Sequence, residues 1–511
     1  MKSAVRIFPD TYVDSVVQLS ATRALHQVEG VDWAAAAMAT PANLETLRQE
    51  GFPEEDLVDA GANDLFLAVR AGRADVIETA LAAGEAAMFA ARRPQVDPVE
   101  QPPRTLEQAL ARQPGSNVAV VSVPGDYAAL EAHKALSAGL DVLLFSDNVP
   151  VEAEIALKER AERLGRLVMG PGAGTAMLGR TCLGFANIVR PGRIGVVAAA
   201  GTGAQEVATL LDRWGAGVSH IIGLGGRDLS EAVGGRMATM AIRALCEDEQ
   251  TDVILLVSKP PAEHTARAVL GTARGKPLIA ALIGLDAAFD VADNVVLTDT
   301  LEAGAVAAAR AAGLDAGDLT GDLRQRVASA VARLAPQRTL IRGLFSGGTL
   351  CYESLVILSR LLGPVYSNTP IRTGWGLPEP AGSHVCLDLG EEEYTRGRPH
   401  PMIDPEARVE LLREQGKDPE VGVVLLDVVL GYGAHPDPAG ALAPVCAEIG
   451  RGDGPVVVAY VLGTDQDPQG YTAQRRKLEE AGCIVTDTAA RASLAAAALI
   501  SRNPDLIGEA R

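Results

Sequence analysis

Aromatic residues are scarce in this sequence. Phe, Trp and Tyr make up 4% of the 511 residues, whereas 48% of the residues are hydrophobic. The hydrophobic cores must therefore be built mainly from Ala, Val and Leu. The 53 glycines and 30 prolines are typical of a chain with many tight turns. The length and this composition predict an α/β protein of three or four domains.

Cysteine pairs, excess positive charge and long apolar runs are also missing. The six cysteines are scattered and none forms a CxxC pair, so we predict neither a metal site nor a disulfide framework. The formal net charge of −19 disfavours a nucleic-acid partner, and solubility is the simpler explanation of this acidity. No apolar run reaches the roughly 18 residues of a membrane helix, and the start, MKSAVRIFPD, is not typical of a signal peptide. We therefore expect no membrane partner and a cytoplasmic protein.

One local pattern organises the rest of the chain. The segment Arg193–Val207, RIGVVAAAGTGAQEV, predicts a buried strand, a tight glycine turn and the start of a helix, and Leu340–Ser354, LIRGLFSGGTLCYES, repeats it. A helix start presents free backbone N–H groups, and the helix dipole favours an anion there. The candidate substrate- or phosphate-binding residues are Gly201, Thr202, Gly203 and Ala204 at the first start, and Ser346, Gly347, Gly348 and Thr349 at the second.

These two segments open two similar runs of sequence. Predicted strands and helices follow in the same order in both runs, and the motif LTDT of Leu297–Thr300 matches VTDT of Val485–Thr488. We infer a duplicated flavodoxin-like domain. Because such copies usually pair about a pseudo-two-fold axis, we expect the two helix starts to converge on a shared cleft that can hold sulfate or phosphate. A chance similarity of Val- and Ala-rich segments is the alternative.

The predicted organisation of the whole chain is α/β and multi-domain. We expect a small N-terminal α+β domain (1–95), a linker (96–113), a shortened Rossmann-like domain of the CoA-binding type (114–190), a first ligase-like flavodoxin domain (191–315), a helical linker (316–336) and a second such domain (337–511). No GxGxxG motif follows the first strand of 114–190, so a nicotinamide dinucleotide is not supported.

Charged residues in loops after the predicted strands supply possible helpers for an anion. Gly225 and Gly226 precede Arg227, whose guanidinium could clamp a phosphate or carboxylate. The remaining candidates are Lys259, Arg396, Gly433 and His435. His435 could donate to a carbonyl oxygen or relay a proton. The alternatives are ordinary surface roles and, for His435, the fixing of its Pro-flanked turn.

The motifs of this chain resemble those of the succinyl-CoA synthetase superfamily. PGRIGVVAAAGTGAQE, GLGGRDL, SDNVPVEAE and MGPGAG are similar, in order, to segments of the α subunit, over roughly residues 115–505. SGGTLCYESL and GYGAHPDPAG, together with the N-terminal unit, resemble the FdrA branch more closely. The resemblance implies two flavodoxin-like ligase domains whose helix starts hold a phosphate between them.

Departures from the superfamily pattern limit what the resemblance implies. The synthetase carries its phosphoryl group on a histidine, but here no histidine occurs between His264 and His384. An ATP-grasp domain and the turn that holds the CoA phosphate have no counterparts. We therefore expect phosphate to be bound directly, without a phosphohistidine. No cofactor is predicted with certainty: phosphate or carbamoyl phosphate is the expected ligand, and CoA or a nucleotide is possible but not supported.

The resemblance to FdrA proteins implies a subunit of a carbamoyltransferase of the oxamate type. Phosphate would attack a ureido substrate such as oxalurate to give carbamoyl phosphate and oxamate, with His435, Arg227 and Lys259 as the catalytic residues. We expect a small anionic substrate, partner proteins encoded nearby and a homo-oligomer. A CoA ligase that works with separate ATP-grasp chains and a non-catalytic scaffold or sensor are the alternatives.

Overall fold

In the computed structural model, residues 2–508 are described, apart from residues 12, 14, 58–59, 90–102, 286–289 and 396–398. The chain divides into two compact units. The first begins at Met1 and ends at Pro103, and the second contains Arg104–Thr395 and His400–Arg511. In the described part of the chain, no helix is both long and apolar enough to cross a membrane.

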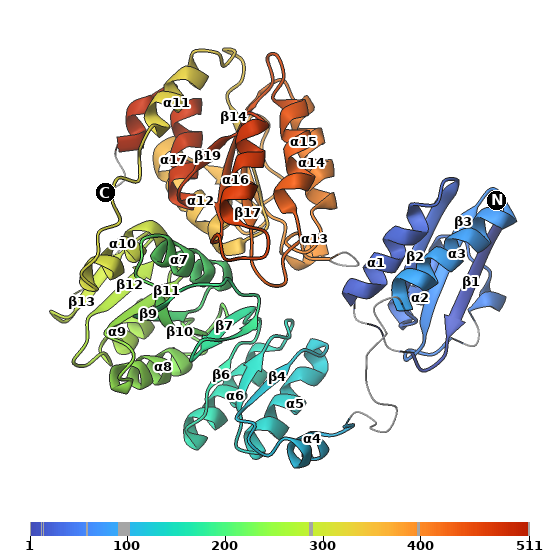
Figure 1. The fold of residues 1–511 in the computed structure, drawn as a ribbon, viewed down its shortest axis with the longest axis horizontal. Coiled ribbons are helices and arrows are strands. Elements are labelled where there is room, and N and C mark those ends of the chain that lie inside the picture. The colour runs from blue at the N-terminus through green and yellow to red at the C-terminus, as the bar shows by residue number, and fades with distance from the viewer. Residues whose placement is uncertain are drawn as a thin grey trace. The chain divides into compact units, whose positions relative to one another are not determined.

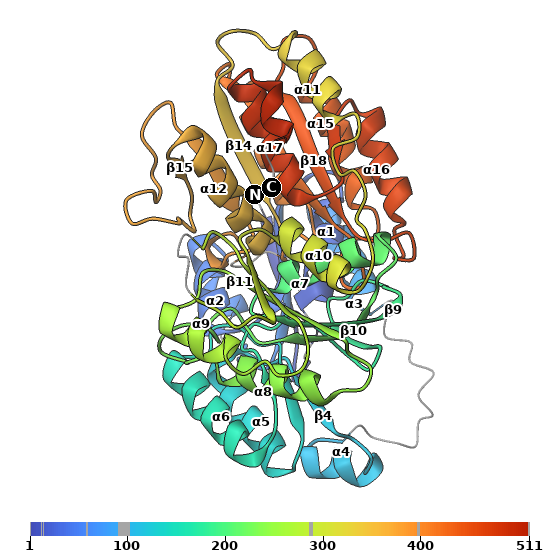
Figure 2. The same ribbon diagram turned by 90° about the vertical axis from the view of Figure 1, so that its left-hand side faces the viewer.

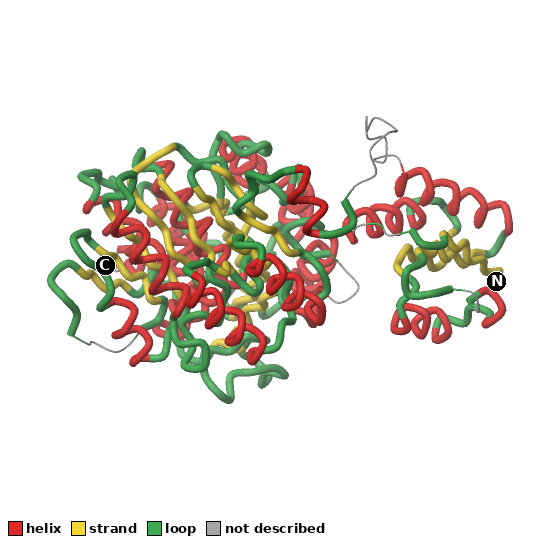
Figure 3. The backbone as a smooth tube through the Cα atoms, turned by 90° about the horizontal axis from the view of Figure 1, so that it is seen from below, coloured by secondary structure: helices red, strands yellow, loops and turns green. Residues whose placement is uncertain are grey.

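The N-terminal unit is a three-stranded antiparallel sheet with helices on both faces (Figure 3). Its elements are β1 (Lys2–Phe8), α1 (Ser15–His26), β2 (Val31–Met38), α2 (Pro41–Gln49), β3 (Leu65–Ala71) and α3 (Ala74–Phe89), and the strand order is β1-β3-β2. The central strand β3 is buried on both faces: Leu65, Leu67 and Val69 pack with α1 and α3, and Phe66 packs with α2.

The second half of the predicted linker contains a short helix. The helix α4 (Leu106–Arg112) begins after Thr105, whose hydroxyl accepts a hydrogen bond from the amide of Gln108 at 3.3 Å. This N-cap satisfies one of the free amides of the first turn. The predicted linker over 96–113 therefore contains a short helix, and residues 90–102 lie outside the described part.

The Rossmann-like sheet has three parallel strands in the order β4-β5-β6. Its elements are β4 (Val118–Val121), α5 (Gly125–Ser137), β5 (Asp141–Leu144), α6 (Val151–Leu164) and β6 (Val168–Met169). The hairpin of β7 (Thr175–Leu178) and β8 (Thr181–Gly184) follows, and Met177 pairs with Ile221 of the next sheet. The sequence placed this hairpin in the Rossmann-like domain, whereas the structure adds it to the first flavodoxin-like sheet.

The duplicated part contains two sheets of the same topology (Figure 1). The first copy consists of β9 (Pro191–Ala198), α7 (Gly201–Arg213), β10 (Val218–Gly223), α8 (Arg236–Glu247), β11 (Val253–Ser258), α9 (Glu263–Leu270), β12 (Leu278–Leu282), β13 (Val295–Thr298) and α10 (Leu301–Ala311). Its parallel strands lie in the order β13-β12-β11-β9-β10, and β7 and β8 extend the sheet.

The second copy follows the connecting helix α11 (Leu323–Val331). It consists of β14 (Leu340–Phe345), α12 (Gly348–Leu362), β15 (Val365–Tyr366), β16 (His384–Asp388), α13 (Glu392–Thr395), α14 (Glu406–Lys417), β17 (Val421–Val429), α15 (Pro438–Ile449), β18 (Val456–Leu462), α16 (Tyr471–Glu480), β19 (Ile484–Thr486) and α17 (Ala489–Ile500), and the short 3-10 helix η2 (Pro504–Gly508) ends the described chain. The strand order β16-β14-β17-β18-β19 repeats the flavodoxin-like order of the first copy, as the sequence predicted.

Four helices, α7, α10, α12 and α17, lie between the two sheets and share one hydrophobic core (Figure 2). Glu206, the sixth residue of α7, accepts a hydrogen bond from the first amide of α17, Ala489, at 3.4 Å. Glu353, the sixth residue of α12, accepts one from the first amide of α10, Leu301, at 2.7 Å. Each copy therefore caps the last helix of the other, which is the reciprocity that a pseudo-two-fold axis requires.

Candidate functional site

The two predicted anion-binding helix starts meet in direct contact. The amide of Thr349 donates to Oγ1 of Thr202 at 3.3 Å. A Cβ atom on Gly203 would lie 2.9 Å from Cγ2 of Thr349, and one on Gly347 would lie 3.0 Å from Cγ2 of Thr202, so both positions need glycine. The predicted convergence of the two starts is confirmed, although they touch each other rather than facing across an open cleft.

The helices begin slightly earlier than the sequence indicated. Ala200 is the N-cap of α7 and Gly347 is the N-cap of α12, so Gly201 and Gly348 are already helical. Gly201, Thr202 and Gly203 therefore form the first turn of α7 rather than a separate turn before it. This placement keeps their N–H groups among the unpaired donors of a helix start.

The start of α12 is closed by a carboxylate of its own chain. Asp427 accepts hydrogen bonds from the amides of Ser346 at 2.8 Å and Gly347 at 2.7 Å. Its Oδ1 also pairs with Nη2 of Arg408 at 3.0 Å, and both side chains are buried. Two candidate donors of this start are thus occupied internally, and Thr202 accepts from a third, the amide of Thr349.

The start of α7 remains open. No described residue accepts a hydrogen bond from the amides of Gly201, Thr202 or Gly203, and Gly201 is exposed. Strand register explains the difference between the copies: Val257 pairs with Ala198, two residues before the N-cap of α7, and Asp427 occupies the equivalent position in the second copy. A valine cannot accept these hydrogen bonds, so this start keeps free donors for an external anion.

Lys259 is the predicted basic residue that lies beside this junction. Its Nζ is 5.3 Å from the centre of the Tyr352 ring on α12. Asp388, at the end of β16, lies on the same side of α12, since a Cβ atom on Gly348 would be 2.4 Å from Oδ2 of Asp388. Burial, with Glu391 nearby, raises the pKa of Asp388 to about 6, while Lys259 acts in the opposite direction. One residue from each copy thus contributes charge at the junction.

Arg227 and its two glycines are oriented toward the Rossmann-like sheet. Arg227 donates to the carbonyl oxygen of Val149 at 2.7 Å and pairs with Oε2 of Glu154 at 2.8 Å. Gly225 has φ +78°, and a Cβ atom there would lie 2.3 Å from the carbonyl oxygen of Pro171. Gly226 lies nearer the junction, with the carbonyl oxygen of Ala199 4.0 Å from its would-be Cβ. Arg227 already has a carboxylate partner, so its role as an anion clamp stays a prediction.

The same interface contains a buried charge network that the sequence did not suggest. Lys158 is fully buried, and its Nζ donates to Glu154 and Asp228 at 2.8 Å each and to the carbonyl oxygen of Leu224 at 3.0 Å. Asp228 also accepts from the amide of Ala238 in α8. These contacts fix the loop that carries Arg227 against α6.

His435 fixes its own turn. Its Nδ1 accepts from the amide of Asp437 at 3.0 Å, and its amide donates to the carbonyl oxygen of Met402 at 2.7 Å. Gly433 packs against the Phe185 ring. These contacts agree with the alternative that His435 fixes its Pro-flanked turn. The turn uses only Nδ1 of the imidazole ring. Arg396 lies outside the described residues.

Two carboxylates near the junction could have been recognised from the sequence as site residues. Asp427 interrupts the buried apolar strand β17, and Asp388 ends the largely buried strand β16. A carboxylate in such a strand needs a partner, which marks both positions for attention. His400 gave no such signal: burial lowers its pKa to about 4, and its Nδ1 accepts from the amide of Met402.

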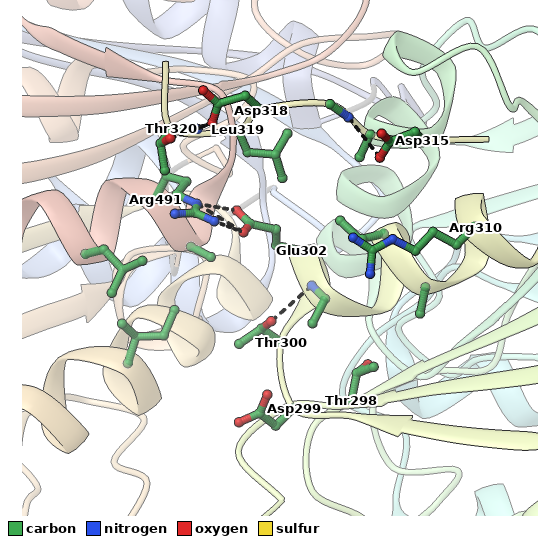
Figure 4. A pocket seen from close by; sticks show the side chains of 18 of the residues that line it. Thr298, Asp299, Thr300, Glu302, Arg310, Asp315, Asp318, Leu319, Thr320 and Arg491 are labelled. Atoms are coloured by element: carbon green, nitrogen blue, oxygen red, sulfur yellow. Dashed lines mark hydrogen bonds and ion pairs between the residues drawn. The ribbon is translucent and has the colours of Figure 1, made fainter. Parts of the chain in front are cut away.

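A large cavity lies away from these predicted residues. It has a volume of about 830 Å³ and lies between α10, the end of α12, the start of α17 and residues 315–320 (Figure 4). None of the candidate residues that the structure describes lines it. The cavity and the helix-start junction are therefore separate features of the duplicated part.

Comparison with known proteins adds family matches at both ends of the chain. A family profile described as CoA-ligase matches residues 344–499. Another, described as "AllF, heavy metal-associated domain", matches residues 1–102. The protein YahF of Escherichia coli strain K12 is 39% identical over 521 aligned residues, which cover 99% of this chain and 100% of YahF.

More distant relatives are subunits of CoA ligases. The α subunit 2 of an ADP-forming succinate–CoA ligase from Archaeoglobus fulgidus is 28% identical, over 34% of this chain and 62% of that subunit. The α subunit of a malate–CoA ligase from Methylorubrum extorquens is 27% identical, over 34% of this chain and 60% of that subunit. A solved dinucleotide-forming acetyl-coenzyme A synthetase 1 from Ca. Korarchaeum cryptofilum is 17% identical over 77% of this chain and 84% of its own, with a TM-score of 0.27, which is too low to define a common arrangement.

The flavodoxin-like topology, the paired helix starts and the CoA-ligase match define a member of the acyl-CoA synthetase superfamily that is similar to the α subunit of succinyl-CoA synthetase. Within it, the chain belongs to the FdrA family together with YahF, with which it aligns over almost its whole length.

The residues of the N-terminal unit do not fit the metal in the description of its family. Residues 1–102 contain no cysteine, and the one histidine there, His26, has its Nε2 3.0 Å from the carbonyl oxygen of Ala34. Among the described residues, no three His, Cys, Asp or Glu side chains gather into a possible metal-binding group. Soft metals select thiolate and imidazole ligands, which this unit does not bring together.

Proposed function

We propose that this chain is a subunit of a carbamoyltransferase that transfers a carbamoyl group from a ureido substrate such as oxalurate to phosphate. The open start of α7 carries the proposal: three unpaired amides lie at the junction of the two copies, beside Lys259. Backbone N–H groups and a lysine ammonium are typical ligands of phosphate. A cytoplasmic location belongs to the same proposal.

In the proposed reaction, a phosphate oxygen forms a bond to the ureido carbonyl carbon, and the bond from that carbon to the inner nitrogen breaks. The proton of the phosphate passes to the leaving nitrogen, so the products are carbamoyl phosphate and oxamate. The amides of α7 would hold the phosphate close and oriented, and Lys259 would offset its charge. Asp388, with a pKa of about 6, is suited to carry the proton near neutral pH.

A CoA ligase is the alternative, and the loops of the Rossmann-like sheet give it little support. A Cβ atom on Gly125 would lie 2.4 Å from the carbonyl oxygen of Asp147 and 2.5 Å from that of Asn148, so the loops after β4 and β5 close on each other. Asp126, in the first turn of α5, and Asp147, in the loop after β5, are acidic and would repel a diphosphate. These residues do not fit the phosphates of CoA, and no step of the proposal uses CoA.

Partner chains are also part of the proposal. The α subunits similar to this chain work in ligases with other subunits by name, and exposed apolar side chains at the edge strand β4 and on α5 are consistent with assembly. We propose that a second copy of this chain pairs there, with proteins encoded nearby completing the complex. Sedimentation equilibrium tests the first part: replacing Leu130 by Lys should convert a dimer into a monomer.

The decisive experiment is a phosphate-dependent assay of the chain with and without the proteins encoded beside its gene. Carbamoyl phosphate should form from oxalurate and phosphate with the complete set, and Lys259→Ala should lower the rate. Lys417→Ala, at an exposed lysine on α14, is the matched control. A rate that is independent of phosphate, or formation of a CoA thioester in its place, would overturn the proposal.

A further inference from the structure

The cavity beside α10 has the size and construction of a ligand site. Its volume of about 830 Å³ lies within the range of small-molecule pockets. Both copies and the segment that connects them form its walls, and Val306, Ala307 and Ile357 give one side an apolar surface. The helix-start junction is distant: Ile357, the residue of α12 nearest to it that lines the cavity, lies nine residues along the helix from Gly348, or about 14 Å.

The apolar helix face at this cavity is more open in the first copy than in the second. The helix α17 is the counterpart of α10, and its residues Leu494 and Ala495 are buried in a core that also contains residues of α11 and η2. The equivalent residues of α10 are Val306 and Ala307, which are only partly buried and line the cavity. Leu494 also borders the cavity, but it is buried, so the duplication leaves the face of α10 at Val306 and Ala307 more open than the matching face of α17.

The charged groups around the cavity leave one cation available. Arg491 pairs with Glu302 at 2.8 Å, and Arg360 pairs with Asp299 at 2.5 Å. The guanidinium of Arg310 forms no hydrogen bond or ion pair with a described residue, and it points into the cavity (Figure 4).

The nearby acids are satisfied within the connecting segment. Asp315 accepts from the amide of Gly317, and Asp318 accepts from the amide and hydroxyl of Thr320. Arg310 is therefore the group that an external anion would meet beside the apolar wall.

We propose that this cavity binds a small amphipathic anion, whose carboxylate or phosphate pairs with Arg310 and whose apolar body lies on Val306, Ala307 and Ile357. A guanidinium forms bidentate hydrogen bonds with either anion, and the alanine- and valine-rich wall favours an aliphatic or planar body. The site is separate from the proposed transfer site, so a ligand here would act on the enzyme as an effector rather than as a substrate.

Isothermal titration calorimetry of the full chain tests this site with hexanoate and hexyl phosphate as the two anionic probes and hexanol as the uncharged control. One of the anions should bind, hexanol should bind at least about 10-fold more weakly, and the tighter anion identifies the head group. Arg310→Gln should weaken that binding about 10-fold or more, whereas Arg243→Gln, at an exposed arginine of α8, should leave it unchanged.

A second variant tests the apolar wall. Ala307→Trp fills the cavity and should abolish binding, while the circular dichroism spectrum stays that of the wild type. The proposal is overturned if neither anion binds the wild-type chain, or if Arg310→Gln and Ala307→Trp both bind as the wild type does.

Discussion

The two helix starts of the duplicated part differ in one buried position. In the second copy, Asp427 lies below the start of α12 and accepts from its amides, whereas Val257 occupies the same register position below the start of α7. The carboxylate of Asp427 occupies the position at which an external anion would accept hydrogen bonds from the helix start. Val257 has no acceptor, so the equivalent position below α7 is free. A duplicated fold can thus keep the geometry of two anion sites while one of them has most of its donors occupied by the protein's own groups.

Other parts of the duplication have stayed reciprocal. Arg213, the thirteenth residue of α7, donates to the carbonyl oxygen of Asp487, and Arg360, the thirteenth residue of α12, pairs with the side chain of Asp299. Both aspartates belong to the repeated TDT motif. The contacts between the copies have therefore been retained where the site residues have diverged.

Removal of the carboxylate that closes α12 should have the largest effect. Asp427→Ala leaves Arg408 buried without its partner and frees two amides in the core, which should lower the free energy of unfolding by about 3–5 kcal/mol. Urea denaturation measures this loss. Asp427→Asn keeps an acceptor oxygen and should lose less. If both variants were as stable as the wild type, Asp427 would not be the group that holds this start closed.

The buried glutamates at equivalent positions should make stability depend on pH. Burial raises the pKa of Glu206 to about 7, above an ordinary value near 4.5, so the folded state binds the proton more tightly than the unfolded state does. This contribution to stability is fully present below pH 4.5 and is lost as the pH rises through 7. The wild type should therefore lose about 3 kcal/mol relative to Glu206→Gln between pH 4.5 and 7.5.

The comparison variant for this effect is Glu353→Gln in the second copy. Burial also raises the pKa of Glu353, with Glu206 as the next cause, so the two variants should have non-additive effects on the pH profile. Denaturation of the two single variants and the double variant at both pH values measures the coupling. A pH profile of Glu206→Gln parallel to that of the wild type would show that Glu206 titrates normally.

Loss of the lysine at the open start should have an intermediate effect. Lys259→Ala removes the ammonium that lies over the Tyr352 ring near the junction, and loss of a charge-assisted contact of about 1.5–3 kcal/mol should weaken phosphate binding about 10- to 150-fold. Titration calorimetry with inorganic phosphate measures this change, and Lys417→Ala again serves as the control. Unchanged affinity would place the anion elsewhere and would contradict the comparison of open and closed starts.

The topology and the contact between the helix starts could be predicted because they follow from local patterns. The strand–glycine–helix segments at Gly201 and Gly348 repeat in sequence, and the order of elements that follows fixes the flavodoxin-like sheets. Whether the amides of each helix start are free or occupied could not be predicted, because this depends on which residue of a neighbouring strand lies below the start. That pairing joins Asp427 to Ser346 across 81 residues, a distance at which sequence patterns carry little information.

The direction of charged side chains was also beyond prediction. Arg227 follows a strand end that faces the junction, but its guanidinium turns to Glu154 of another sheet. The buried Lys158 fixes the loop on both sides of Arg227, because it contacts the carbonyl oxygen of Leu224 and the carboxylate of Asp228. It also pairs with Glu154. Spacing along a strand places a residue at an edge, whereas packing between domains decides where its side chain lies.

The smallest effects are expected at His435 and Arg227, because the structure gives both a partner within the fold. For His435→Ala, the turn loses the acceptor Nδ1 for the amide of Asp437, so about 1 kcal/mol of stability should be lost. If its role is only to fix this turn, the turnover of the reconstituted complex should change less than about 3-fold, which is under 1 kcal/mol.

Arg227→Ala should likewise leave phosphate affinity within about 3-fold of the wild type, because its guanidinium already pairs with Glu154. The variant leaves that buried carboxylate without its arginine, although Lys158 still holds its other oxygen at 2.8 Å. The measurable cost should therefore be a lower free energy of unfolding rather than weaker phosphate binding. Steady-state kinetics and urea denaturation of the same preparation separate the two effects. If phosphate affinity fell 10-fold or more while the free energy of unfolding stayed unchanged, Arg227 would be a ligand of the anion. The functional site would then include the loop of the first copy that carries Arg227.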